Sequence, residues 1–152
     1  MKIEDVIKAT VPMSLSKKIV LNVMYAQNVI GENFNELLKP LDLSAEQYNV
    51  LRILRGQKGK PANMCVIQER MIAKTSNTTR LVDKLLLKDL VTREVCPDNR
   101  RKMEVSITQK GLELLKDLDA KVDAHETQFS DNLTPNEQEQ FNYLLEKYRT
   151  IK

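Results

Sequence analysis

The sequence predicts a mainly α-helical subunit with a small β-wing: six helices plus a two-stranded antiparallel β-ribbon. Apolar residues recur at three- and four-residue spacing along most of the 152 residues, as they do on one face of a helix. Alternation with period two, which is typical of strands, occurs only in two short runs after residue 90. The chain has just 4 glycines and 5 prolines, and so few helix-breaking residues favour long helices.

The first long helix is predicted over residues 14–38, and Pro40 ends it. Its apolar side chains cover more than one stripe of the helix surface, so this helix needs more than one neighbour. They are Leu15, Ile19, Val20, Leu21, Val23, Met24, Tyr25, Val29, Ile30, Phe34, Leu37 and Leu38. A second helix begins at Ser44 and runs to about Gly56, because Ser44 and Gln47 form a capping-box pattern that satisfies free amides of the first turn.

Two shorter helices follow, separated by a short polar turn. The third helix is predicted over residues 63–72, and residues 73–75 form the turn. The fourth runs from Ser76 to about Lys88, because the Ser76 hydroxyl suits an N-cap. The residues that fall on its apolar face are Leu81, Val82, Leu85 and Leu86. Leu87 falls on the polar face, where a contact with the following loop would explain it.

The β-ribbon is predicted after Leu90, where the apolar period changes to two. Residues 91–95 and 103–107 alternate and form its two strands. Residues 96–102 form the connecting turn. Three consecutive cations lie in this turn: Arg100, Arg101 and Lys102. The ribbon is therefore expected to have a basic tip.

Two further helices complete the predicted fold. Thr108 caps a fifth helix that runs to about Ser130. Thr134 caps the last one, with Pro135 at its first position and Glu137 closing a capping box. The apolar stripe of the last helix is formed by Phe141, Leu144, Leu145, Tyr148 and Ile151.

Charge is distributed unevenly along the chain. The overall net charge is only +3, but residues 52–110 hold 14 basic and 6 acidic side chains, a net of +8. Residues 1–51 and 111–152 have net charges of −1 and −4. A basic middle between two mildly acidic flanks indicates that the middle segment meets a polyanion. On charge alone, a basic surface without a partner is an equally open alternative.

Several classes of protein lack support in this sequence. No apolar run of about 18 residues predicts a membrane-spanning helix, and no apolar signal core follows the N-terminus, so a cytoplasmic protein is expected. The sequence has no glycine-rich nucleotide motif. Cys65, Cys96 and the single histidine, His125, do not have the spacing of a metal site or a catalytic triad. We therefore expect no enzymatic activity, cofactor or metal, with Cys65 packed among apolar residues and His125 exposed on a helix.

Helix, short turn, helix and β-ribbon in this order form a winged helix-turn-helix. The exposed N-terminus of the helix that begins at Ser76 can enter a major groove and present side chains to base edges. Arginines of the ribbon tip can reach the adjacent minor groove. The predicted DNA-binding residues are Ser76, Asn77, Thr79, Arg80, Lys84, Arg100, Arg101 and Lys102. For Arg55, Lys58 and Lys60, contact with phosphate and a role in keeping the loop soluble are equally open.

Residues 79–85, 90–93 and 100–111 resemble the MarR family of transcriptional regulators. The most specific part is the wing signature, an arginine followed at fixed spacing by Val105, an aliphatic residue, Thr108 and Gly111. In a single subunit, we expect a winged-helix DNA-binding lobe over residues 43–107 and a helical dimerisation region formed by residues 1–42 and 108–152. The resemblance implies a homodimer on near-palindromic double-stranded DNA, which acts as a repressor and is released by a small-molecule effector or another signal.

One position departs from the family pattern. The family has an acid immediately before the paired arginines, where it is thought to brace the wing, and this chain has Asn99 there with Asp98 one residue earlier. Asn99 accepts hydrogen bonds but carries no charge. Cys96, at the base of the wing near Arg93, is a candidate redox residue because neighbouring cations activate thiols.

Two alternatives to a DNA-binding regulator remain. A winged-helix module that binds protein and not DNA would keep the same fold, but the basic segment argues against it. A small enzyme would need a nucleophile and a base, and the sequence shows no such pair.

Overall fold

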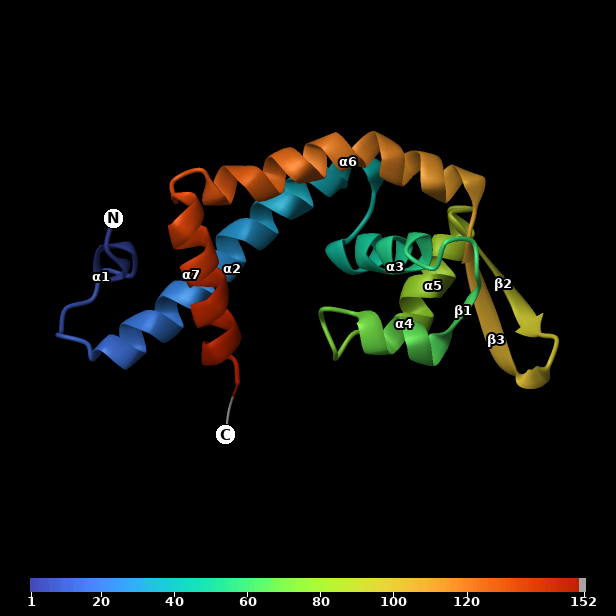
Figure 1. Ribbon diagram of the computed structural model, residues 1–152, viewed down its shortest axis with the longest axis horizontal. Helices are drawn as coiled ribbons and strands as arrows, with labels where there is room; N and C mark the ends of the chain where they lie inside the picture. Colours follow the sequence, from blue (N-terminus) through green and yellow to red (C-terminus); the bar gives the residue numbers. More distant parts are fainter. Residues whose placement is uncertain (151–152) are drawn as a thin grey trace. The chain divides into compact units, whose positions relative to one another are not determined.

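The computed structural model describes residues 1–150 of the chain (Figure 1). The chain divides into two compact units, Met1–Tyr48 and Asn49–Lys152, and the division falls inside the helix α3, Ala45–Arg55. Seven α-helices, one short 3-10 helix and three strands lie within residues 1–150. None of the helices described is both long and apolar enough to cross a membrane.

The first unit is built on one long helix, α2, Leu15–Leu38. The predicted bounds are confirmed: the Ser14 hydroxyl caps the start by accepting a hydrogen bond from the Lys17 amide at 3.3 Å. Pro40 lies in the 3-10 turn η1, Lys39–Leu41, that follows directly. A four-residue helix that the sequence analysis missed, α1, Ile3–Val6, precedes α2.

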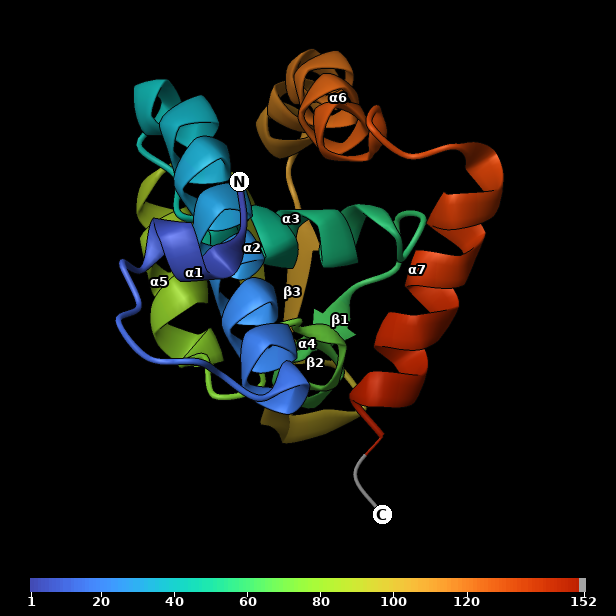
Figure 2. The same ribbon diagram turned by 90° about the vertical axis from the view of Figure 1, so that its left-hand side faces the viewer.

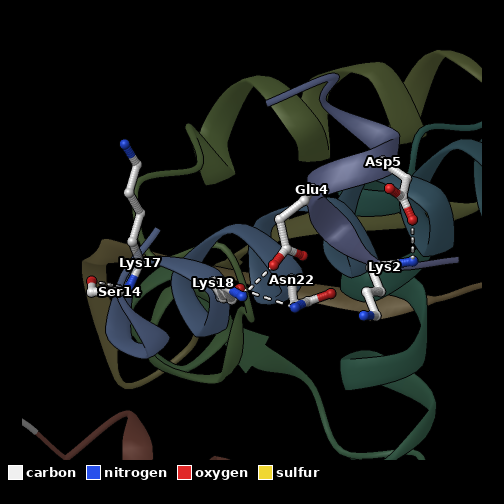
Figure 3. Close-up of polar contacts among 7 residues, drawn as sticks. All are labelled: Lys2, Glu4, Asp5, Ser14, Lys17, Lys18 and Asn22. Carbon is white, nitrogen blue, oxygen red and sulfur yellow. Dashed lines mark hydrogen bonds and ion pairs between the residues drawn. The ribbon is translucent and has the colours of Figure 1, made fainter. Parts of the chain in front are cut away.

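The helix α1 is held against α2 within this unit. An ion pair joins the Glu4 carboxylate to the Lys18 ammonium (Figure 3). Ile3 is buried. The Lys18 contact lowers the pKa of Glu4 below its ordinary value. A helix of four residues is too short to show an apolar period, which explains why the pattern did not predict it.

The helix α3 begins as predicted. The Ser44 amide donates to Gln47 Oε1 and the Gln47 amide donates to Ser44 Oγ, both at 3.1 Å, so the capping box is confirmed. Tyr48 packs its ring edge-on against Phe34, with ring centroids 5.2 Å apart.

In the second unit, α4, Met64–Arg70, and α5, Thr78–Leu87, form the predicted helix-turn-helix. The prediction that Ser76 caps α5 is wrong. The Ser76 amide donates to the Ala73 carbonyl, so Ser76 belongs to the turn. Asn77 is the cap instead, because its Oδ1 accepts a hydrogen bond from the Arg80 amide at 3.1 Å.

The β-ribbon has a third strand that the sequence analysis did not predict. The sheet order is β1–β3–β2, all antiparallel, with β1 at Ala62–Asn63, β2 at Val91–Cys96 and β3 at Asn99–Ile107. A strand of two residues has no readable alternation. The predicted seven-residue turn is also too long, because only residues 97–98 connect β2 to β3. The hairpin of β2 and β3 projects from the helices as the wing (Figure 1).

Two helices follow the wing. Thr108 caps α6, Gln109–Ser130, and accepts from the Gly111 amide at 3.1 Å. A turn then leads into α7, Pro135–Tyr148, which runs steeply across the direction of α6 (Figure 2). Its predicted capping box between Thr134 and Glu137 is confirmed. Ile151, predicted on the last apolar stripe, lies outside the described residues.

Candidate nucleic-acid interface

Two side-chain amides fix the turn between α4 and α5. Asn49 on α3 is buried, and its Oδ1 accepts from the Ile72 amide at 3.0 Å. Gln68 on α4 donates to the Lys74 carbonyl at 2.7 Å and accepts from the hydroxyl of buried Thr78, the first residue of α5. These bonds tie the turn to α3 and the start of α5 to α4. They therefore set the direction in which α5 points.

The helix α5 keeps its apolar face inside and its polar face in solvent. Val82 and Leu85 are fully buried, whereas Asn77, Thr79 and Arg80 are exposed at the N-terminal end. Lys84 is exposed one turn further on, and Ser76 is half-buried in the preceding turn. All five predicted DNA-binding residues of this segment thus lie on or beside the free face of α5. Leu87 is 86% exposed on this face, so the contact with the following loop offered for it is not found.

The three wing cations lie in a strand and not in a loop. Arg100, Arg101 and Lys102 are exposed in the first half of β3. They lie where the pairing of β3 with β2 is irregular: Val95 pairs with Met103 and Cys96 with Asn99, so these three residues form a bulge without partners on β2. Asn99 stabilises the start of the strand, because its Oδ1 accepts from the Arg101 amide at 3.0 Å. Asn99 therefore braces the backbone of Arg101 without a charge.

An ion pair joins α5 to the wing. The Arg93 guanidinium on β2 lies 2.7 Å from the Asp83 carboxylate on α5. Both side chains are partly exposed, and Arg93 is paired with Val105 of β3 in the sheet. The two elements predicted to contact DNA are thus connected directly.

The base of the wing is packed tightly against the start of α6. The Thr108 amide and hydroxyl donate to the carbonyls of Leu90 and Asp89, at 3.0 and 2.7 Å. The Lys110 ammonium donates to the Lys88 carbonyl at 2.8 Å. Gly111 lies against this junction so closely that a side chain has no room there: a Cβ would lie 2.5 Å from the Leu90 carbonyl oxygen. This close approach gives the glycine of the wing signature its physical reason.

Comparisons with known proteins agree with this geometry. The MarR family profile matches residues 43–103. A MarR transcription factor from Planctomyces limnophilus has a similar crystal structure, with 32% identity and a TM-score of 0.69 over 90% of this chain and 98% of that one. The chain belongs to the MarR family.

Two other proteins are also similar to this chain, one in sequence and one in structure. The multiple antibiotic resistance protein MarR of Escherichia coli (strain K12) is 29% identical over 74% of this chain and 78% of its own length. BpsR of Bordetella bronchiseptica shares the fold, with a TM-score of 0.80 at 20% identity over 93% of this chain and 100% of that one. As a MarR-family protein, the chain is a DNA-binding transcriptional regulator.

Two predictions outside the MarR signature are wrong. Cys65 is exposed on α4 and not packed. His125 is 8% exposed and packs edge-on against Phe129, with ring centroids 5.2 Å apart. Both residues lie in helices of mixed composition, in which one wrong helical phase moves a side chain from one environment to the other. Among residues 1–150, no three His, Cys, Asp or Glu side chains gather into a metal site.

Other residues of the site carry interactions that the sequence did not reveal. Arg55, offered as a phosphate contact, instead holds both carboxylate oxygens of Asp119 on α6, at 2.9 and 3.0 Å. Asn49, Gln68 and Asp83 were missed, because bonds to partners far apart in sequence leave no local pattern. Cys96 is half-buried at the end of β2, immediately before the wing turn.

Proposed function

We propose that this MarR-family regulator is a homodimeric repressor that inserts α5 into the major groove and the wing into the flanking minor groove. The observation that carries this proposal is the exposed, cation-bearing face of α5 together with the basic strand of the wing. On α5, the proposed base-edge and phosphate contacts come from Ser76, Asn77, Thr79, Arg80 and Lys84. On the wing they come from Arg100, Arg101 and Lys102.

The terminal helices support the proposed homodimer. MarR-family regulators bind DNA as dimers. On α2, seven apolar side chains are 38–73% exposed: Leu15, Ile19, Val20, Val23, Met24, Tyr25 and Ile30. On α7, Phe141, Tyr143, Leu144, Leu145 and Tyr148 are 36–60% exposed. A second copy of the chain that covers these stripes would remove a large apolar area from water. This agrees with the proposed division into a winged-helix lobe, residues 43–107, and a dimerisation region, residues 1–42 and 108–152.

Two copies related by a two-fold axis would place two α5 helices on a near-palindromic site, about one helical turn apart. BpsR is a protein whose DNA binding is regulated by 6-hydroxynicotinic acid. By analogy with that relative, we propose that a small molecule releases this repressor from its operator. Regulation through DNA binding needs no catalytic step, so we assign the chain no enzymatic activity. We also propose that it acts in the cytoplasm.

Selection from a random DNA pool, followed by gel-shift titration, tests the proposal. An enriched palindrome is expected, with an affinity that falls steeply as salt rises because bound phosphates release counterions. Arg80→Ala is expected to reduce discrimination between the selected and a scrambled duplex by roughly tenfold, as for the loss of one base contact. Arg101→Ala is expected to weaken binding to both duplexes alike. Lys121→Ala, which removes an exposed cation from α6, is the matched control.

The outcomes separate the alternatives. No enriched sequence together with a flat salt dependence would favour the protein-binding module. Equal affinity of Arg80→Ala, Arg101→Ala and the unmodified protein for both duplexes would contradict the assignment of the contact residues.

A further inference from the structure

The structure places an acid on the face of α5 that is proposed to meet DNA. Asp83 lies three residues after Arg80 and one before Lys84, and its side chain is 51% exposed. Near phosphates, such a carboxylate repels the ligand. On charge alone, removing it should tighten binding to every DNA sequence. The pairing of Asp83 with Arg93 gives it another role.

The Asp83–Arg93 pair joins two elements that would contact different grooves. Arg93 lies on β2, opposite Val105 of β3, so its backbone is anchored to both strands of the wing through the sheet. Arg93 Nη1 and Asp83 Oδ1 are 2.7 Å apart. Since the pair is partly exposed, it adds little to the stability of folding. Its main effect is to hold one geometry between α5 and the wing.

We infer that Asp83 is a positioning residue for sequence-specific DNA recognition, which acts by holding Arg93 and with it the wing. This inference rests on the proposed function and deepens it. When the pair is intact, α5 and the wing meet their grooves together, so the ordering of one also orders the other. When the pair is broken, each element must be placed separately, and only the correctly spaced specific site loses affinity.

A double-mutant cycle tests this role. The readout is the ratio of affinities for the selected palindrome and for mixed-sequence DNA. We expect Asp83→Asn, Arg93→Gln and the double variant each to lower this ratio by about two- to fivefold, which is what one partly exposed ion pair can supply. The losses should not add, because each variant breaks the same pair. Asp83→Glu, which keeps the carboxylate, should retain most of the ratio. Asp123→Asn, the same change at an exposed acid of α6, should leave it unchanged.

If Asp83 and Arg93 acted only through their charges, the variants would show a different pattern of affinities. Asp83→Asn would then bind both DNAs more tightly, Arg93→Gln would bind both more weakly, and the ratio would stay constant in all three variants. That result, or a higher ratio for Asp83→Asn, would overturn the inference.

A second measurement needs no DNA. Nitroxide labels at Leu87→Cys on α5 and Val95→Cys on β2 are accessible, since these positions are 86% and 52% exposed. In a Cys65→Ser and Cys96→Ser background, Asp83→Asn should broaden the distribution of distances between the labels. If Asp83→Asn leaves the distribution of label distances unchanged, the inference is overturned, even when the unmodified protein binds DNA normally. Failure of the unmodified protein to prefer any sequence would instead contradict the proposed function.

Discussion

Gly111 offers a test of how tightly the wing is joined to the helix that follows it. It lies in the first turn of α6 and is buried. A Cβ built there would lie 2.5 Å from the Leu90 carbonyl oxygen and 2.7 Å from Cγ1 of Ile107. The Leu90 oxygen belongs to the backbone and already accepts the Thr108 amide at 3.0 Å. It therefore cannot move aside without loss of a hydrogen bond.

The expected effect of Gly111→Ala is the difference between two opposing terms. Alanine in place of glycine inside a helix favours folding by about 0.5–1 kcal/mol. Overpacking against a rigid backbone costs about 1–3 kcal/mol, and a weakened hydrogen bond costs about 1 kcal/mol more. The steric term wins, so we expect a net loss of about 1–3 kcal/mol in the free energy of unfolding.

Urea denaturation followed by circular dichroism measures this loss, at one fixed protein concentration because dimerisation adds to the apparent stability. Gly31→Ala is the matched control. Gly31 lies inside α2, where an added Cβ meets no atom within 4 Å apart from the adjoining residues and backbone of its own helix, so this change should raise stability by about 0.5–1 kcal/mol. A Gly111→Ala variant as stable as the unmodified protein, or more stable, would refute the reasoning about the junction.

Three further changes test other parts of the structure. Asn77→Ala removes the N-cap of α5 and should cost about 1 kcal/mol of stability, measured by the same denaturation; no loss would contradict the assignment of the cap. The bond to Lys18 is the main cause of the lowered pKa of Glu4, so the ion pair stabilises the fold above pH 4.5 and loses this effect as the pH falls further. Glu4→Gln should therefore flatten the plot of stability against pH in this range. An NMR titration that gives Glu4 an ordinary pKa would exclude the pairing. Thiol oxidation should lower DNA affinity in Cys65→Ser but not in Cys96→Ser, and equal affinity before and after oxidation would reject a redox role for Cys96.

Local signals predicted α3 and α7 well because each of them begins with a capping box. The boxes at Ser44 and Thr134 need only a partner three residues away, and both formed as expected. At the start of α5 the sequence analysis chose Ser76 as the cap, whereas the adjacent Asn77 is the residue that caps the helix. Which of them caps depends on where the turn from α4 ends. That position is set by Asn49 and Gln68 through bonds to Ile72, Lys74 and Thr78, and these bonds have no local pattern.

The candidate site was predicted by residue type but not by arrangement. The cations of the wing were identified from their number and position, while their placement in β3 depends on the pairing of Cys96 with Asn99. Arg55 was read as a free cation, although its charge is matched by Asp119, 64 residues later in the chain. Composition shows that charges exist, but only the tertiary fold shows which of them are already paired.

The strand placement of the wing cations changes how the wing can meet DNA. In a loop, Arg100, Arg101 and Lys102 could all turn towards one groove. In β3, they are the three residues that bulge between two pairs of the ladder, Cys96 with Asn99 and Val95 with Met103. A bulge bends its strand and changes where its side chains point, so the three cations are held close to the tip of the wing, where an arginine can enter the minor groove and the other cations can reach phosphates. Asn99 suits this arrangement, because its bond to the Arg101 amide fixes the backbone and leaves the guanidinium uncommitted to a neighbouring acid in the turn.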